Sequence, residues 1–226
     1  MIRDTGLPPL SEQDWREMVL RLAHEIRNPL ATIKSATQLV QRWMRPEGEV
    51  AESLQGILVN VARIDRTLKD LQRFVRLDVG ESARQPVAEA VEDVVADQLP
   101  EAQRRGVAVL VAGGPAARVL IDPKNLGAAL EELLANAVRV TAAGGTVMIS
   151  WVCVGEEVLL HVDDEGPGVP PELEDKILRP FFSTSAQGTG LGLNFVDKAC
   201  RLAGGALSWR NLAGRGCRFT MRLPRG

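Results

Sequence analysis

The sequence predicts an α+β protein in two parts, an antiparallel helical hairpin followed by helices packed on a mixed sheet. In the first part, apolar residues recur in alternating steps of three and four, which is the spacing of a coiled coil. Beyond residue 80 the pattern changes to strand-length apolar runs that alternate with helical segments. A chain of 226 residues can hold two domains. We place them at residues 10–80 and 81–226.

The predicted hairpin consists of two helices that each carry an apolar seam. The seam of the second helix is an unbroken heptad pattern at Leu54, Ile57, Val61, Ile64, Leu68, Leu71 and Val75. The matching seam of the first helix comprises Trp15, Val19, Leu22, Ile26, Pro29, Ile33, Ala36, Val40 and Trp43. Turn residues at 45–48 separate the two helices. Because two helices cannot enclose a core, we expect the hairpin to dimerise into a four-helix bundle, with both tryptophans in its core.

The second part begins after a predicted linker at residues 81–86. Helices are expected at 87–105, 122–141 and 190–203, and Asp122-Pro123 supplies an N-cap and a first-turn proline for the second of them. Strands are expected at 107–111, 118–121, 146–154, 158–163, 206–210 and 217–223. This order predicts helices that cover one face of a sheet.

Composition excludes several classes of protein. The chain has 27 Lys and Arg against 29 Asp and Glu, and neither part has the basic excess of a nucleic-acid binder. No run approaches the roughly 18 apolar residues of a membrane span, so we expect no membrane contact. No secretory signal is visible, which favours a cytoplasmic location. The three cysteines are expected to be buried, reduced thiols.

The string HEIRNPL at residues 24–30 is the most suggestive in the hairpin. His24 and Asn28 lie one turn apart on the side of the helix that faces away from the seam. An outward imidazole is reachable by another protein, and the adjacent Glu25 can accept its ring proton. The alternative is an ordinary surface histidine. Pro29 is expected to kink the helix beside it.

Two glycine-rich strings occur in the second part. DEGPG at residues 164–168 follows an apolar strand, and GTGLGL at 188–193 opens a predicted helix. The second string has G-x-G-x-G spacing and follows a polar segment, which argues against a dinucleotide-binding Rossmann turn. Backbone N–H groups in such a turn still favour an anion, and a phosphate is a physically reasonable ligand.

Glu132, Asn136 and Arg139 share one face of the predicted helix at 122–141. In that arrangement a carboxylate could act as a base or metal neighbour, the amide oxygen as a Mg²⁺ ligand, and the guanidinium as a phosphate clamp. A solvated helix face is the alternative for this stripe taken alone. His161 and the strand tryptophans Trp151 and Trp209 are expected to serve packing.

Together these strings resemble the motifs of the sensor histidine kinases of two-component systems, over essentially the whole chain. HEIRNPL is similar to the phosphoacceptor box, ELLANAVR (132–139) to the asparagine box, and DEGPG to the first glycine box. RPFF (179–182) and GTGLGL are similar to the phenylalanine box and the second glycine box. The resemblance implies a dimerisation and phosphotransfer hairpin joined to a catalytic domain of the Bergerat ATP-binding fold, an α/β sandwich shared with gyrase-type ATPases.

The resemblance also implies roles for individual residues. His24 would be phosphorylated, Glu25 would accept its proton, and Asn28 would position water when a phosphorylated partner is dephosphorylated. Asn136 would bind Mg²⁺, and Asp164 would accept a hydrogen bond from the adenine amino group of ATP. The remaining residues implied to bind the nucleotide are Gly166, Gly168, Phe182, Gly188, Thr189, Gly190, Leu191 and Gly192.

The sequence departs from the family pattern at two places. Glu132 stands where these kinases commonly have asparagine, and related ATPases often place a catalytic glutamate there. The lid at residues 182–188 lacks a basic residue, and Arg139 is expected to supply its charge.

Three functions follow from these features. The first is autophosphorylation of His24 with transfer to an aspartate of a response-regulator receiver domain, with phosphatase activity as a second activity. The second is a phosphatase-dominated signalling scaffold with weak kinase activity, and the third is a gyrase-like ATPase. Only about 10 residues precede the first predicted helix, whereas a sensing domain needs about 50 or more. Either a partner delivers the input, or this is the cytoplasmic core of a longer, membrane-bound sensor.

Overall fold

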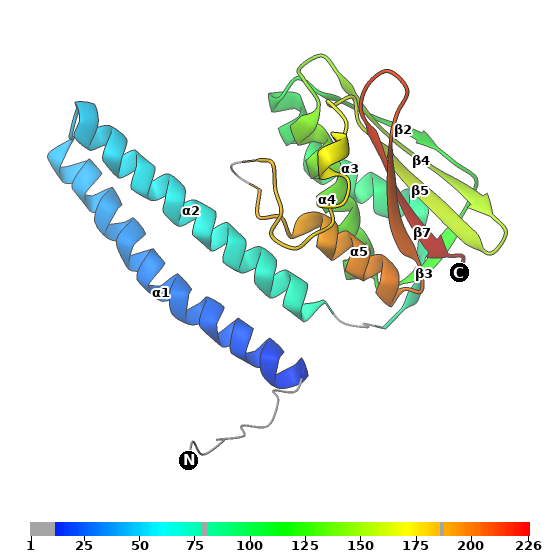
Figure 1. The fold of residues 1–226 in the computed structure, drawn as a ribbon, viewed down its shortest axis with the longest axis horizontal. Coiled ribbons are helices and arrows are strands. Elements are labelled where there is room, and N and C mark those ends of the chain that lie inside the picture. Colours follow the sequence, from blue (N-terminus) through cyan, green and yellow to red (C-terminus); the bar gives the residue numbers. More distant parts are fainter. Residues whose placement is uncertain (1–11, 78–80, 186–187) are drawn as a thin grey trace. The chain divides into compact units, whose positions relative to one another are not determined.

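The computed structural model describes residues 12–77, 81–185 and 188–226, and the chain divides into two compact units after Arg76. The first unit is helical, and the second combines helices with a sheet (Figure 1). The predicted α+β class, with the hairpin first, is confirmed. Within the described ranges, none of the helices has both the length and the apolar character that a bilayer-spanning helix needs.

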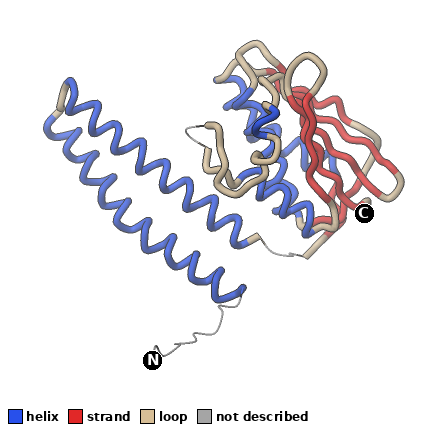
Figure 2. Tube along the Cα trace, in the orientation of Figure 1, coloured by secondary structure: helices blue, strands red, loops and turns tan. Residues whose placement is uncertain are grey.

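The first unit is a hairpin of two long helices, α1 (Glu12–Met44) and α2 (Gly48–Arg76), which run antiparallel (Figure 2). The predicted turn lies between them, where Arg45 and Gly48 have positive φ angles of 41° and 58°. Pro29 lies inside α1, and the helix continues past it to Met44. The missing N–H of the proline therefore weakens the helix locally but does not end it.

The hairpin buries only part of the two predicted seams. Its buried apolar residues include Val61, Leu68 and Val75 of α2, which belong to the predicted seam, and Val19, Ala23 and Leu30 of α1, of which only Val19 does. Other seam residues are exposed, namely Leu22, Ile26, Ile33, Val40, Ile57 and Ile64. Trp15 and Trp43 are exposed as well, Trp43 by 81%, so one hairpin alone does not bury them, and their place in the core of a bundle stays a prediction. The reason is that one hairpin can cover only one side of each helix.

The second unit is built on a mixed sheet with the strand order β2-β4-β5-β7-β6. Its strands are β2 (Ala108–Gly113), β4 (Thr146–Val154), β5 (Glu157–Asp163), β7 (Cys217–Pro224) and β6 (Ala206–Asn211). The β2–β4 pair is parallel and the other pairs are antiparallel. As Figure 2 shows, one face of the sheet is covered by helices, which are α3 (Val87–Arg104), α4 (Pro123–Val140) and α5 (Gly192–Leu202).

Helix α4 begins as the sequence predicts. The Asp122 side chain accepts a hydrogen bond from the Asn125 N–H at 3.0 Å, and Pro123 occupies the first turn. Its apolar stripe is buried, with Leu126, Leu130, Leu133, Leu134, Ala137 and Val138 all in the core. This packing fixes the rotation of α4 and leaves the face of Glu132 and Asn136 only half-buried.

Two expected boundaries differ from the structure. The segment predicted as a linker contains strand β1 (Ala83–Pro86), which pairs antiparallel with β3 (Arg118–Ile121) in a separate two-stranded sheet. Helix α5 begins at Gly192 and not at residue 190 as predicted, because Gly190 has a φ of 71°, which lies outside the helical region. The short segment that precedes α5 is therefore a loop.

Candidate functional site

Asp164 lies directly after β5 and is only 3% exposed. Its Oδ1 accepts hydrogen bonds from the N–H groups of Gly166 at 2.8 Å and Cys217 at 3.3 Å. Among the described residues, the structure gives no partner for Oδ2. Burial raises the pKa of Asp164 above its ordinary value, although the two backbone hydrogen bonds act in the opposite direction. The side chain is thus a fixed acceptor that can take a donor from a ligand.

The neighbouring residues have a different, supporting role. Arg218 donates to both oxygens of Asp163, at 2.6 and 2.5 Å, so this carboxylate is already satisfied. His161 shares a hydrogen bond of 2.8 Å between Nδ1 and Thr220 Oγ1, and burial lowers its pKa. Both side chains belong to the sheet, as the sequence predicts for His161.

Glycines allow close backbone approach around Asp164. A Cβ added at Gly166 would lie 2.8 Å from Asp164 Oδ1, and one at Gly168, where φ is 75°, would lie 2.9 Å from Asn211 Oδ1. The sequence reasoning missed Gly216, where a Cβ would lie only 1.8 Å from the Asp164 carbonyl oxygen. Only its place in a glycine-rich turn between two predicted strands could have indicated it. Side chains at these positions would displace the backbone around the carboxylate.

The second glycine box contacts the phenylalanine box directly. Phe181 donates its N–H to the Gly190 carbonyl at 3.0 Å, and a Cβ on Gly190 would lie 2.4 Å from the Phe181 carbonyl carbon. Phe181 itself has a φ of 63° and is 62% exposed, whereas Phe182 is half-buried. A Cβ on Gly188 would lie 2.0 Å from Ser183 Oγ. The structure therefore brings the predicted residues of these two boxes together in one loop region.

The asparagine-box residues of α4 contact one another and, through Glu132, approach the start of α5. Arg139 donates a hydrogen bond to Asn136 Oδ1, so two of the three predicted residues are in contact. Glu132 points toward the second glycine box, because a Cβ on Gly192 would lie 2.5 Å from its Oε2. Leu191, which precedes the helix, is buried. The Glu132 carboxylate of α4 thus lies beside the N-terminal end of α5, where backbone N–H groups favour anions.

These side chains fit a magnesium ion that is shared with a nucleotide. Glu132 and Asn136 supply a carboxylate and an amide oxygen, which are hard donors of the kind that Mg²⁺ prefers. In nucleotide sites this ion is commonly held by one or two protein oxygens together with phosphate oxygens. Across the residues that the structure describes, no group of three or more His, Cys, Asp or Glu side chains could hold a metal. The fit is therefore to a metal held jointly, with Asn136 as the predicted ligand.

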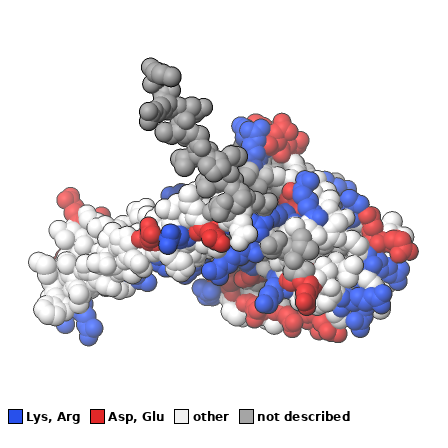
Figure 3. Space-filling view, turned by 90° about the horizontal axis from the view of Figure 1, so that it is seen from below, with Lys and Arg blue, Asp and Glu red and all other residues white. Residues whose placement is uncertain are grey.

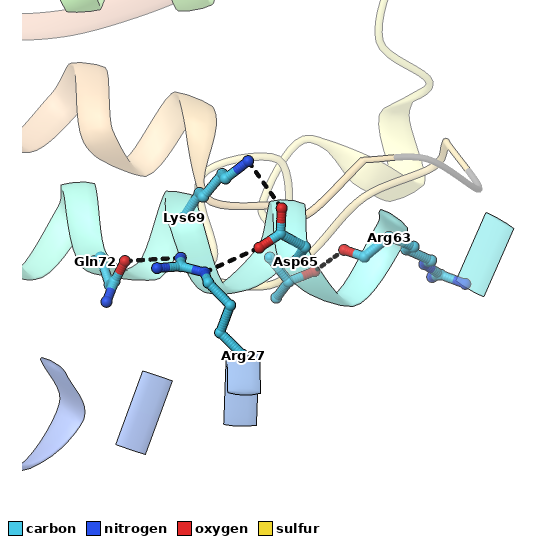
Figure 4. A network of polar contacts seen from close by, with 6 residues as sticks. Arg27, Arg63, Asp65, Lys69 and Gln72 are labelled. Atoms are coloured by element: carbon cyan, nitrogen blue, oxygen red, sulfur yellow. Dashed lines mark hydrogen bonds and ion pairs between the residues drawn. The ribbon is translucent and has the colours of Figure 1, made fainter. Parts of the chain in front are cut away.

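The phosphoacceptor string lies on α1, in the hairpin. His24, Glu25 and Asn28 are all exposed, as expected for residues that face away from the seam. Arg27 lies in the same turn and extends across to α2, where it contacts Asp65 and Gln72 (Figure 4). Sequence reasoning did not assign these contacts, since local periodicity carries no information about partners so far along the chain.

The surface charges and the three cysteines agree with what the composition predicts. On the face seen in Figure 3, basic and acidic side chains are interspersed over the second unit. The three cysteines are free thiols. Burial raises the pKa of Cys200 and of Cys217 to about 12 each, so these two are the buried, reduced thiols that the sequence predicts, while Cys153 is half-buried.

Comparison with known families gives two matches that follow the order of the two units. Residues 14–80 match the His Kinase A (phospho-acceptor) domain. Residues 121–226 match the family described as histidine kinase-, DNA gyrase B-, and HSP90-like ATPase. Together the two matches cover most of the chain, and the second includes all the nucleotide-site residues discussed above.

Individual relatives agree. The chain is 28% identical over 233 residues to the alginate biosynthesis sensor protein KinB of Pseudomonas aeruginosa. The aligned region covers 99% of this chain and 39% of KinB. It is also 31% identical over 209 residues to the sensor histidine kinase ZraS of Salmonella typhimurium. That aligned region covers 90% of this chain and 44% of ZraS. The chain thus spans less than half the length of these relatives.

Solved structures show the same architecture. Full-length ShkA in complex with AMPPNP matches with a TM-score of 0.73 at 26% identity, over 93% of this chain and 46% of ShkA. The histidine kinase ThkA in complex with the response regulator protein TrrA matches with a TM-score of 0.69 at 25% identity, over 93% of this chain and 61% of ThkA. With a phosphoacceptor hairpin, an ATPase-like sheet domain and relatives of this kind, the chain belongs to the sensor histidine kinases of two-component systems.

Proposed function

We propose that this protein phosphorylates His24 with ATP and then passes the phosphoryl group to an aspartate of a response regulator. One observation carries the proposal: an exposed histidine of the phosphoacceptor string and a buried Asp164 surrounded by glycines occur in the same chain. The match to ShkA, solved with AMPPNP, supports an adenine nucleotide as the ligand. The match to ThkA, solved with TrrA, supports a response regulator as the partner.

The residues of the second unit would bind and orient ATP. Asp164 Oδ2 would accept a hydrogen bond from the exocyclic amine of adenine, and guanine would be rejected because it presents a carbonyl there and leaves two acceptors facing each other. The glycine loop before α5 would bring backbone N–H groups to the phosphates. Asn136 and Glu132 would hold Mg²⁺, which when bound neutralises phosphate charge, and Arg139 would add a cation.

In the transfer step a ring nitrogen of His24 attacks the γ-phosphorus of ATP. The new N–P bond forms as the bond from the γ-phosphorus to the bridging oxygen breaks, and ADP leaves with the electron pair. Glu25 accepts the proton from the other ring nitrogen, which keeps the attacking nitrogen nucleophilic. In the second step an aspartate oxygen of the partner attacks the same phosphorus, and His24 leaves. Asn28, one turn from His24, would orient water when the phosphorylated partner is hydrolysed.

Labelled ATP tests this proposal. Incubation with Mg²⁺ should give an acid-labile, alkali-stable phosphoprotein, and His24→Ala should abolish the label. The chain has two histidines, so His161→Gln is the matched control and should keep the label. Label that survives in His24→Ala would contradict the assignment.

Glu132 favours a second candidate, a protein in which ATP hydrolysis competes with histidine phosphorylation. A carboxylate beside the glycine loop could activate water as a base. Steady release of ADP without phosphoprotein, abolished by Glu132→Gln, would support this ATPase. Rapid dephosphorylation of a phosphorylated response regulator without self-labelling would instead support a phosphatase-dominated scaffold that uses Asn28.

The exposed half of the hairpin seam supports a homodimer. Exposed apolar residues on both helices, including Leu22, Ile33, Ile57 and Ile64, form a stripe that a second hairpin would bury in a four-helix bundle.

A further inference from the structure

A small polar network joins the phosphoacceptor turn of α1 to α2. Arg27 Nε donates to Asp65 Oδ1 at 3.0 Å, and Arg27 Nη2 donates to Gln72 Oε1 at 2.9 Å. Lys69 Nζ contacts the other oxygen of Asp65 at 2.8 Å. Figure 4 shows the Arg27 side chain extended from α1 to reach both acceptors on α2. The guanidinium lies only three residues after His24, on a neighbouring part of the same helix surface.

The geometry of these contacts restrains how α1 is placed against α2. Asp65 and Gln72 are seven residues apart, which is about two turns of helix. One planar guanidinium that contacts both acceptors resists sliding of α1 along α2 and rotation of α1 about its own axis, because either motion would break a hydrogen bond. A single lysine contact would restrain neither motion to the same degree.

The network restrains the placement of α1 but contributes little to the free energy of unfolding. The Arg27 and Asp65 side chains are 30% and 31% exposed, so solvent screens their attraction. In the described part of the chain, Gln72 Nε2 is buried without a hydrogen-bond partner. Turning the amide over would place its NH₂ group against the Arg27 guanidinium, so the contact with Arg27 keeps Gln72 in this orientation. A buried donor left without an acceptor is unfavourable, which points to a geometric role.

The neighbouring backbone and packing make such a restraint useful. Pro29 has no N–H, so the Glu25 carbonyl loses its normal helical hydrogen bond in the turn that carries His24. Ala23 and Leu30 pack with Val61 and Leu68 of α2 on either side of Arg27, but Ala23, the buried residue next to His24, has a small side chain. The missing backbone hydrogen bond therefore leaves the turn of His24 less restrained than a regular helical turn, and the Arg27 contacts add a restraint there.

We propose that Arg27 is a positioning residue that, through Asp65 and Gln72, sets the rotation of the phosphoacceptor turn so that His24 is presented for phosphoryl transfer. This inference rests on the proposed function of His24. Arg27 acts through the placement of the helix and not through contact with the reacting phosphate.

The test compares variants of the 226-residue chain in autophosphorylation with labelled ATP. Arg27→Met and Asp65→Leu each remove the contact between residues 27 and 65 from one side, and both should lower kcat about tenfold with little change in the KM for ATP, as expected for misplacement of a reacting group. The double variant R27E/D65R reverses the pair and should recover part of the rate, because it restores the contact between residues 27 and 65 but not the guanidinium contact with Gln72. Arg21→Met removes an exposed charge from the same helix and is the matched control, with the wild-type rate.

A second measurement tests whether the variants change the placement of His24, the folding of the hairpin or the reactivity of the imidazole. Phosphoramidate can phosphorylate an accessible histidine without ATP: its P–N bond breaks, ammonia leaves and the N–P bond to His24 forms. This reaction should proceed at the wild-type rate in Arg27→Met and Asp65→Leu, and the helical circular dichroism of both variants should match the wild type.

Several results would overturn the inference. Wild-type kcat in Arg27→Met would show that the contact is not needed. Recovery by Arg27→Lys without recovery by R27E/D65R would assign Arg27 a direct charge effect on the phosphate. If the variants lose autophosphorylation rate in proportion to their loss of helical structure, the network serves folding and not the placement of His24. Absence of ATP-derived label on wild-type His24, with normal phosphoramidate labelling, would overturn the proposed function and this inference together.

Discussion

Asp163 and Asp164 are adjacent carboxylates with opposite environments, and the difference leads to a prediction about pH. Asp163 is paired with Arg218, whereas burial raises the pKa of Asp164. The native state thus binds the Asp164 proton more tightly than the unfolded state does. The stability that this group contributes is present at low pH and is lost as the pH rises through its folded pKa.

Asp164→Asn should therefore abolish ATP binding and yet leave the nucleotide-free protein at least as stable as the wild type at pH 7. The amide still offers an oxygen to the N–H groups of Gly166 and Cys217, and no buried charge remains. Titration calorimetry with ATP and thermal unfolding between pH 4 and 8 measure the two effects. Asp163→Asn is the control and should destabilise the protein, because it leaves Arg218 without its carboxylate. A large loss of stability in Asp164→Asn at pH 7 would contradict the argument.

At the scale of elements, the loop before α5 depends on the absence of a side chain at Gly190. Its φ is 71°, and an added Cβ would lie 2.4 Å from backbone of Phe181 and 2.5 Å from the Phe182 nitrogen. Gly190→Ala should force the two boxes apart and weaken ATP binding by about tenfold or more, since backbone cannot yield as a flexible side chain can. Gly155→Ala is the control, with a φ of 58° and open space around the Cβ, and should cost only about 1–2 kcal/mol of stability. Equal ATP affinity in both variants would count against this role for the loop.

The exposed seam of the hairpin gives a prediction about association. Ile57 lies on the exposed apolar stripe, whereas Val59 is exposed on another side of α2. A charge on the stripe would have to be buried in the four-helix bundle, so Ile57→Asp should give a monomer while Val59→Asp remains a dimer. Light scattering at micromolar concentration measures both masses. A wild-type protein that is monomeric there would contradict the bundle.

The elements that the sequence predicts are those with strong local patterns. The heptad seams give both hairpin helices, and Asp122-Pro123 marks the start of α4, because capping and periodicity are local properties. Strand β1 was missed because it has four residues and depends on pairing with β3, more than thirty residues later. The burial of Ala23 and Leu30 in α1 was also missed, since heptad spacing does not say which apolar residues one chain can cover.

The candidate site also combines features that local sequence patterns predict with contacts that they do not. Its residue types and order came from motifs, and the structure places Gly166 beside Asp164, the phenylalanine box against Gly190, and Glu132 beside the start of α5. Contacts between distant segments, such as Asp164 with the Cys217 N–H and Arg27 with Asp65, could not be predicted. They depend on tertiary packing that no local pattern records.

For the whole molecule, the division into two compact units predicts that the reaction can be reconstituted from separate parts. The hairpin ends at Arg76, and the second unit has its own core and carries every residue proposed to bind ATP. Residues 77–226 should therefore bind ATP alone and should label His24 of a separate 1–76 fragment. A short linker corresponds to an effective concentration in the millimolar range, so at micromolar concentrations labelling should be slower than in the full chain by about 10²–10³ and should rise in proportion to the catalytic fragment.

Labelled ATP and a dilution series measure this dependence. The same mixture with Asp164→Asn in the catalytic fragment is the control and should give no label, because that fragment lacks the acceptor for adenine. A 77–226 fragment that fails to bind ATP, or labelling that does not depend on its concentration, would show that the two units are not independent in the way their separate cores imply.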